Sequence, residues 1–152
     1  MAARDRDGFE VFVAAVEPRL RRAFVARYGS DRGREATAEA LAYAWEHWTR
    51  IARMENPAGF LYRVGQSRTR VRRRGHAVFR APASEPWVEP KLLDALTALS
   101  EQQRTAVVLV HGFQWTLQEV ADLTGVGRTT VQNHLERGLA RLRAALEVHE
   151  DA

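Results

Sequence analysis

The stretch from Thr116 to Arg143 constrains the fold of this chain most, because it places two helix signals on either side of a glycine turn. Thr116 and Glu119 have the spacing of a capping box, in which each side chain satisfies a backbone amide at a helix start. Gly125 and Gly127 tolerate the backbone angles of a tight turn. The pattern therefore predicts a short helix, a turn and a second helix.

The second of these helices has one apolar and one polar face. Apolar residues recur at spacings of four, four and three, which predicts a buried stripe of Val131, Leu135, Leu139 and Leu142. The opposite face carries side chains that can contact base edges and phosphates, namely Arg128, Thr129, Gln132, Asn133, Glu136 and Arg137. Together with the turn, this predicts a DNA-binding helix-turn-helix. A helical hairpin with a merely solvated polar face is the alternative.

The charge of the chain is distributed unevenly. A net charge of +4 and a pI of 10.3 suggest a polyanionic partner. Residues 1–75 hold 16 arginines against 9 acidic residues, whereas residues 76–152 hold 7 basic and 10 acidic residues. The basic half is therefore not the half that contains the helix-turn-helix, and charge alone is weak evidence for the DNA-binding surface.

Several functional classes are disfavoured by composition. Cysteine is absent, which excludes a disulfide framework, a thiolate metal site and a cysteine nucleophile. No apolar run approaches the roughly 20 residues of a membrane span, and the N-terminus is too charged for a signal peptide. Phosphate loops and hydrolase or metalloprotease motifs are absent, and the five histidines are scattered. We expect a soluble cytoplasmic protein that needs no metal or cofactor and is not an enzyme.

Three helices are predicted in the N-terminal half. The first covers 8–28 and should bend or split at Pro18, which lacks a backbone donor. The second covers 34–54 after a turn at 29–31, and Asn56-Pro57 stops it. A third helix is predicted at 58–73. This helix and the residue after it contain no acidic side chain and carry six arginines: Arg63, Arg68, Arg70, Arg72, Arg73 and Arg74. These arginines favour phosphate contact, although a solvated helix end remains the alternative.

The C-terminal half is predicted to be a separate four-helix domain. A proline-containing linker at 76–90 precedes a short amphipathic helix at 91–99. Ser100 and Gln103 form a second capping box, starting a helix that ends near Gly112. Phe113 and Trp115 are expected to seal the small core beneath the helix-turn-helix. The predicted fold is all-α, with domains at 1–75 and 91–146 and a frayed acidic tail at 147–152.

At this point the chain resembles a known family. Its helical N-terminal module, arginine-rich third helix, proline linker and C-terminal helix-turn-helix resemble the bacterial RNA polymerase sigma factors of the extracytoplasmic-function (ECF) group, which keep only domains two and four. The best-matched pieces are LTALSEQQRTAVVLVHGFQWTLQEVADLTGVGRTTVQNHLERGLARLR in domain four and ALAYAWEHW with GFLYRVGQSRTRVRRR in domain two.

The resemblance implies roles for particular residues. It implies docking on core RNA polymerase through the second helix, at Glu35, Glu39, Ala42 and Trp45. It implies contact with the minus-ten promoter element through Phe60, Tyr62, Gln66, Ser67, Arg68 and Arg70. It implies reading of the minus-thirty-five element through Arg128, Thr129, Thr130, Gln132, Asn133 and Arg137, with Arg141 and Arg143 toward phosphate. An anti-sigma factor is a further partner that the family suggests.

The chain departs from the family pattern at three places. Ala38 stands where the acidic dock usually has a polar residue, and Gln66-Ser67 replaces Arg-Asn in the melting segment. Leu99-Ser100 replaces Leu-Pro, a mild change because serine caps helices well. Two alternatives therefore stay open: a sigma-like protein that does not open promoters, and a regulator with a LuxR-like recognition helix, which the segment TVQNHL resembles. A purely structural adaptor would show no salt-dependent affinity for DNA.

Overall fold

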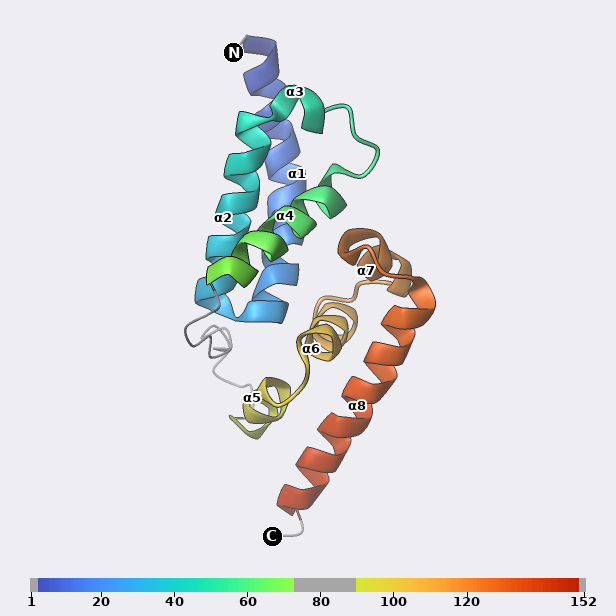
Figure 1. The fold of residues 1–152 in the computed structure, drawn as a ribbon. Coiled ribbons are helices and arrows are strands. Elements are labelled where there is room, and N and C mark those ends of the chain that lie inside the picture. Colours follow the sequence, from blue (N-terminus) through green and yellow to red (C-terminus); the bar gives the residue numbers. More distant parts are fainter. Residues whose placement is uncertain (1–2, 73–89, 151–152) are drawn as a thin grey trace.

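The computed structural model describes residues 3–72 and 90–150, and within these ranges all regular secondary structure is helical. The all-α fold class predicted from the sequence is confirmed. The linker predicted at 76–90 lies outside the described residues except for its last position. The elements are α1 (Ala3–Tyr28), α2 (Ser30–Glu46), α3 (Trp48–Ile51), α4 (Pro57–Arg72), α5 (Pro90–Thr97), α6 (Glu101–Val107), η1 (Val108–Gly112), α7 (Leu117–Thr124) and α8 (Arg128–Glu150) (Figure 1).

Helix α1 is continuous through Pro18, so of the two predicted outcomes, a bend or a split, the split does not occur. A proline inside a helix removes one hydrogen bond and crowds the preceding turn. Buried residues on both sides of it, among them Val16 and Leu20, hold both halves of the helix against the core. Tertiary packing therefore outweighs the local cost.

The second predicted helix is divided at His47. Helix α2 begins directly after Gly29, whose φ of 90° makes the turn, and it ends at Glu46. His47 leaves the helical region with φ −119° and ψ 29°, while its amide still donates to the carbonyl of Tyr43 at 3.0 Å. Its ring stacks on the Tyr43 ring with centroids 4.1 Å apart. The short helix α3 follows, and a turn then leads to α4.

Both predicted capping boxes are present in the C-terminal half. The amide of Gln103 donates to Ser100 Oγ at 3.2 Å, and the amide of Glu119 donates to Thr116 Oγ1 at 3.1 Å. After α6 the backbone widens into the π-helical turn η1, in which the amide of Phe113 donates to the carbonyl of Val108 at 3.1 Å. Helix α8 continues to Glu150, beyond the start of the tail predicted at 147.

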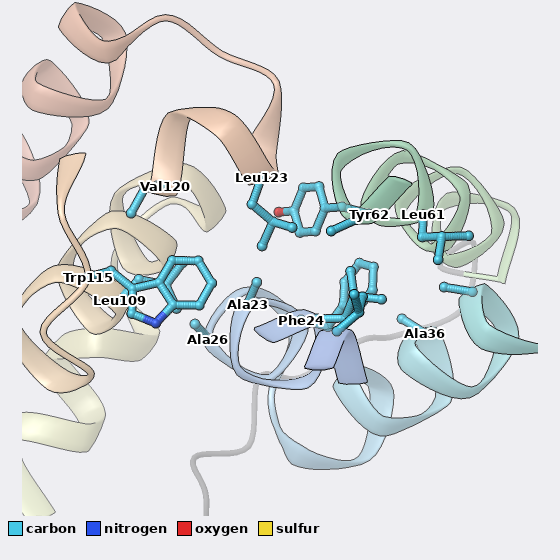
Figure 2. Packing of buried hydrophobic residues seen from close by; sticks show 14 of the residues in the cluster. Ala23, Phe24, Ala26, Ala36, Leu61, Tyr62, Leu109, Trp115, Val120 and Leu123 are labelled. Atoms are coloured by element: carbon cyan, nitrogen blue, oxygen red, sulfur yellow. The ribbon is translucent and has the colours of Figure 1, made fainter. Parts of the chain in front are cut away.

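The hydrophobic core does not stop at the predicted domain boundary. Side chains from α1, α2 and α4 form one continuous cluster with side chains from α6, η1, α7 and the start of α8. Figure 2 shows Leu123 of α7 beside the Tyr62 ring of α4, and Trp115 beside α1. A second, smaller cluster lies within the C-terminal half, around Ala95, Leu99 and Leu142. The N-terminal module (α1–α4) and the C-terminal module (α5–α8) are thus packed against each other.

Candidate nucleic-acid interface

The helix-turn-helix is built from a capped helix, a left-handed glycine and a long second helix. The box between Thr116 and Glu119 fixes the first residue of α7, and its second hydrogen bond, from the Thr116 amide to Glu119 Oε1, measures 3.1 Å. Gly125 ends α7 with φ 75° and ψ 16°, angles that a residue with a Cβ adopts at a cost. Helix α8 begins three residues later.

The polar face of α8 is open to solvent in the first three turns. Every residue proposed to read bases there is exposed: Arg128, Thr129, Thr130, Gln132, Asn133 and Arg137. Gln132 donates only along its own helix, to Glu136 Oε1 at 3.3 Å. Val131 on the opposite side is 1% exposed and anchors the helix in the core. The structure therefore brings these candidates together on one accessible surface.

The two arginines predicted to face phosphate differ in their surroundings. Arg141 donates to Gln103 Oε1 and to the carbonyl of Ala98, both at 3.0 Å, so it links α8 to the turn before α6. Arg143 is exposed. Arg141 therefore has a structural role that the sequence did not reveal. To contact DNA, it would have to give up these two hydrogen bonds.

Part of the α4 surface is also accessible. Phe60, Arg63, Val64, Ser67 and Arg68 line an open depression of about 400 Å³. Aromatic and cationic side chains gather beside it: the Arg50 guanidinium lies 5.5 Å from the Phe60 ring centroid and the Arg68 guanidinium 5.6 Å from that of Tyr43. Such a surface offers a stacking platform and positive charge together, the combination used to hold single-stranded nucleic acid.

Tyr62 and Gln66 do not share that surface. Tyr62 is 0% exposed, its ring stacks on Phe24 at 4.9 Å, and its hydroxyl accepts a hydrogen bond from Arg27 Nη1 at 3.2 Å. Burial raises the pKa of the Tyr62 phenol, and the Arg27 charge opposes that rise. Gln66 is half-buried and lines a cavity of about 130 Å³ together with His134. The side chain of Arg70 lies outside what the structure describes.

The four candidates for polymerase docking lie on α2. At 100° per residue, Glu35, Glu39 and Ala42 fall on one side of the helix, with Trp45 at its edge. Glu35 and Ala42 are exposed and Glu39 is half-buried. Trp45 is 39% exposed, and its ring meets the Phe9 ring edge-on at a centroid distance of 4.9 Å. This arrangement forms a narrow acidic and aromatic strip.

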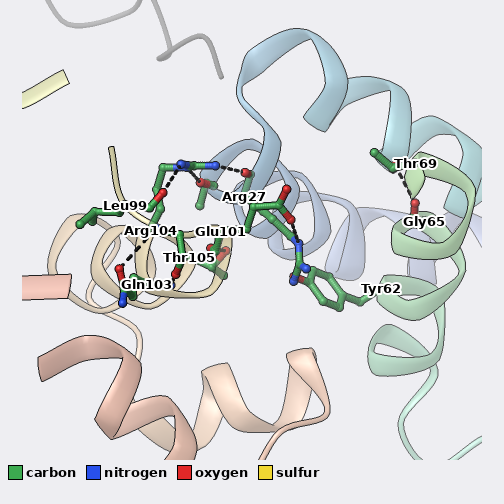
Figure 3. A network of polar contacts seen from close by, with 11 residues as sticks. Arg27, Tyr62, Gly65, Thr69, Leu99, Glu101, Gln103, Arg104 and Thr105 are labelled. Carbon is green, nitrogen blue, oxygen red and sulfur yellow. Dashed lines mark hydrogen bonds and ion pairs between the residues drawn. The ribbon is translucent and has the colours of Figure 1, made fainter. Parts of the chain in front are cut away.

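The sequence reasoning missed a set of polar residues between the two modules. Arg104 of α6 is 4% exposed, and its guanidinium reaches the carbonyls of Ala26 and Arg27 at the end of α1 (Figure 3). Arg27 in turn forms an ion pair with Glu101 at 3.0 Å. No spacing along the chain connects residues more than 70 positions apart, so only the assembled fold could identify them.

Other kinds of site find no support in the described residues. Within residues 3–72 and 90–150, no group of three histidine or acidic side chains is placed to hold a metal ion. In the same part of the chain, none of the helices combines the length and apolar character that crossing a membrane demands. The accessible polar face of α8 and the depression on α4 are therefore the principal candidate sites.

Comparisons with known proteins agree with this geometry. Residues 90–142 match the family model described as sigma-70, region 4. The chain is 42% identical over 59 residues to an RNA polymerase sigma-E factor of Streptomyces antibioticus, covering 39% of this chain and 33% of that protein. It is 45% identical over 56 residues to the factor of the same name from Streptomyces avermitilis, covering 37% and 31%. The matches thus span about a third of the length of these relatives.

A solved structure shares the fold over nearly the whole chain. The sigma factor RpoE of Bartonella quintana, crystallised with the anti-sigma factor NepR, superposes with a TM-score of 0.68. The alignment covers 93% of this chain and 98% of that chain at 22% identity. The fold and the C-terminal match define a class of two-module helical proteins that carry a sigma-70 region 4.

Within that class, the C-terminal module of the chain is similar to region 4 of the RNA polymerase sigma factors, and the chain shares the helical fold of the solved sigma factor. The family resemblance predicted from the sequence is confirmed.

Proposed function

We propose that this chain is an ECF-type sigma factor that binds core RNA polymerase in the cytoplasm and directs transcription initiation at specific promoters. The observation that carries the proposal is the exposed polar face of α8, which begins directly after a left-handed glycine turn in a module matching sigma-70 region 4. A helix presented in this way can enter a major groove, where each base pair has its own pattern of donors and acceptors.

The N-terminal module supports the second half of this role. The depression on α4, with Phe60 at one end and Arg68 beside it, would hold the minus-ten strand through stacking and charge. The strip on α2 formed by Glu35, Glu39, Ala42 and Trp45 would dock on polymerase. We expect each of the two DNA-contacting surfaces to bind weakly alone. Because polymerase would hold both surfaces, binding at the first promoter element would make contact with the second element effectively intramolecular. An anti-sigma factor is a further partner we propose, since the protein sharing this fold was crystallised with one.

One observation favours a second candidate function. The chain could be a sigma-like regulator that binds polymerase or promoter DNA without separating the DNA strands. Gln66 and Ser67 stand where the resemblance would place Arg-Asn, and Tyr62 and Gln66 face inward. If Tyr62 and Gln66 keep these inward positions on the polymerase, the melting surface would consist only of the outer side of α4. The two functions differ in one measurable step, which is strand separation.

Run-off transcription tests the proposal directly. Purified core polymerase, this protein and a pool of genomic promoters from the source organism should give specific transcripts only when the protein is present. Permanganate footprinting on the same templates reports unpaired thymines. Polymerase binding without transcripts and without unpaired bases would favour the regulator, whereas no binding to polymerase or DNA would refute both.

A matched pair of variants on α8 tests the recognition surface. Arg137→Ala should weaken binding to the upstream element by about 1–3 kcal/mol, roughly 5- to 150-fold, if Arg137 makes a base contact. Glu147→Ala changes an exposed residue of the same helix outside the proposed face and should have little effect. Polymerase binding, measured separately, should be unchanged in both. A joint loss of DNA and polymerase binding in Arg137→Ala would contradict this division of labour.

A further inference from the structure

The turn between α5 and α6 is bound by an arginine on each side. Arg104 of α6 donates to the carbonyls of Leu96 and Leu99, at 3.4 Å and 3.1 Å (Figure 3). Arg141 of α8 donates to the carbonyl between them, that of Ala98, at 3.0 Å. Carbonyls at the end of a helix lack partners within the helix and carry partial negative charge, so they attract cations. The two arginines therefore hold this turn between them.

The side chain of Gln103 ties α8 to the same turn. Its Oε1 atom accepts from the Ser100 amide at 3.3 Å, which completes the capping box of α6, and from Arg141 Nη1 at 3.0 Å. An amide oxygen has two lone pairs and can accept both bonds. The second terminal nitrogen of Arg141 binds the Ala98 carbonyl. Because a guanidinium is planar and rigid, these two bonds define a direction as well as a distance.

One turn before Arg141, α8 lies against α6 without a side chain between the two helices. A Cβ at Gly138 would lie 2.8 Å from Val107 Cγ2 and 3.3 Å from both the Cβ and the carbonyl oxygen of Gln103. Gly138 and Arg141 are three residues apart and are therefore neighbours on the surface of α8. Gln103 thus meets α8 at two points, with its backbone and Cβ beside Gly138 and with its side-chain oxygen at Arg141.

Apolar packing by itself would leave the orientation of α8 less well defined. Val131 and Leu142 are 1% and 7% exposed and hold the helix on the module, but apolar burial is non-directional. Arg128 lies thirteen residues before Arg141, or about 20 Å along the helix axis. A tilt of about 10° would therefore displace the Arg128 end by about 3 Å. A recognition site tolerates displacements of only about 0.5 Å.

We propose that Arg141 is a positioning residue that holds α8 at the angle at which its polar face meets base edges, an inference that rests on the proposed reading of DNA by α8. The family resemblance implied that Arg141 faces phosphate, and the two roles have different consequences. Loss of a phosphate contact weakens binding to all sequences alike and reduces its salt dependence. Loss of a positioning contact lowers the preference for the specific sequence.

Titration of two DNA duplexes separates these roles. One duplex carries the upstream element of a promoter mapped by run-off transcription, and the other has the same length and a scrambled sequence. Arg141→Ala should lower the ratio of the two affinities by at least about fivefold, the smaller value for one bidentate base contact. The slope of log affinity against log salt should equal that of the wild type. An unchanged ratio with a slope shallower by about 0.9 would instead show a phosphate contact and overturn the proposal.

Arg143→Ala is the charge-matched control, because it removes the same charge from an exposed residue two positions further along α8. The affinity ratio should stay at the wild-type value in this variant. A fall in the ratio as large as that in Arg141→Ala would attribute the effect to charge and overturn the positioning role.

Gln103→Met tests the same link without any change of charge. It removes the oxygen that accepts from Arg141 and should also lower the affinity ratio. Combined with Arg141→Ala it should lower the ratio no further, because both substitutions break one link, and additive losses would refute that link. Ser100→Ala is the control for the capping box, since it removes the acceptor of the Gln103 amide but leaves the bond to Arg141. An equal fall of the ratio in Ser100→Ala would make the cap, and not the link, responsible.

A distance measurement without DNA tests the orientation of α8 directly. The chain contains no cysteine, so Asp94→Cys on α5 and Thr129→Cys on α8, both at exposed positions, provide two sites for spin labels. The distance distribution should be narrow in the parent and in Arg143→Ala, and broader in Arg141→Ala. An equally narrow distribution in Arg141→Ala would overturn the positioning role. If the distribution broadened but no version of the protein preferred the specific duplex, the proposed function would fall while the role of Arg141 in orienting α8 stood.

Discussion

Gly33 of α2 packs directly against the backbone of α1, and Gly33→Ala should destabilise the N-terminal module. A Cβ at this position would lie 2.6 Å from the backbone nitrogen and Cα of Val25 and 2.8 Å from the carbonyl carbon of Phe24. Real Cβ contacts essentially never approach so closely, and backbone atoms of a packed helix cannot move aside as a side-chain end can. One of the two helices must therefore shift.

Two opposing effects set the size of the change. Alanine is favoured over glycine inside a helix by about 1 kcal/mol. Forcing an extra methyl group into a packed core costs about 1–3 kcal/mol, and the backbone obstacle places this case at the upper end. The net loss in free energy of unfolding should therefore be about 2 kcal/mol. For a chain of this length that corresponds to a melting temperature lower by roughly 4–8 °C.

The control is the same substitution where space exists. In Gly8→Ala, also within a helix, the nearest atom to the new Cβ is Trp48 Cζ2 at 3.7 Å, an ordinary contact. This variant should gain up to about 1 kcal/mol from helix propensity. Urea and thermal unfolding followed by far-UV circular dichroism compare the two. If Gly33→Ala were as stable as Gly8→Ala, the close approach of α1 and α2 would be refuted.

Two further predictions concern the C-terminal module and pH. Thr116→Ala removes the oxygen that accepts from the Glu119 amide and should lower the unfolding free energy by about 1 kcal/mol in denaturant melts, while Gln118→Ala, next to it and exposed, should change it little. The raised pKa of Tyr62 means that the unfolded phenol ionises first as pH rises past its ordinary 10.0. The contribution of Tyr62 to the free energy of unfolding is therefore fully present below about pH 10 and declines above that pH. Tyr62→Phe should show a smaller decline over the same range, and an equal decline would exclude Tyr62 as its source.

Local signals allowed the sequence to predict most helix starts and the turn. The Ser100 and Thr116 boxes act over three residues, and the left-handed Gly125 turn depends on a single residue, so all can be recognised in a short window. The stripe on α8 was also predictable, because Val131 and Leu142 repeat with the helical period and are buried. These features led to the all-α fold and to the exposed polar face of α8.

The remaining features depend on contacts between distant segments. Pro18 is tolerated because of packing around α1, and His47 ends α2 with its ring stacked on Tyr43. Trp115 was expected to close a core within the C-terminal module, but it also meets α1, where the Arg19 guanidinium lies 5.8 Å from its ring centroid. Phe113, expected to seal the same core, is 43% exposed. The inward orientation of Tyr62 follows from Phe24 and Arg27, and no pattern within α4 encodes it.

The two faces of α8 have consequences for how this chain could change over time or by design. Gln132, Asn133 and Arg137 are exposed to solvent, whereas Val131 and His134 on the other side line the cavity between the modules. If this face reads DNA as proposed, substitutions on it can therefore alter sequence preference at little cost in stability. Under that proposal, retargeting the protein to a different DNA site would require exchanging a few solvent-exposed side chains while the scaffold stays the same.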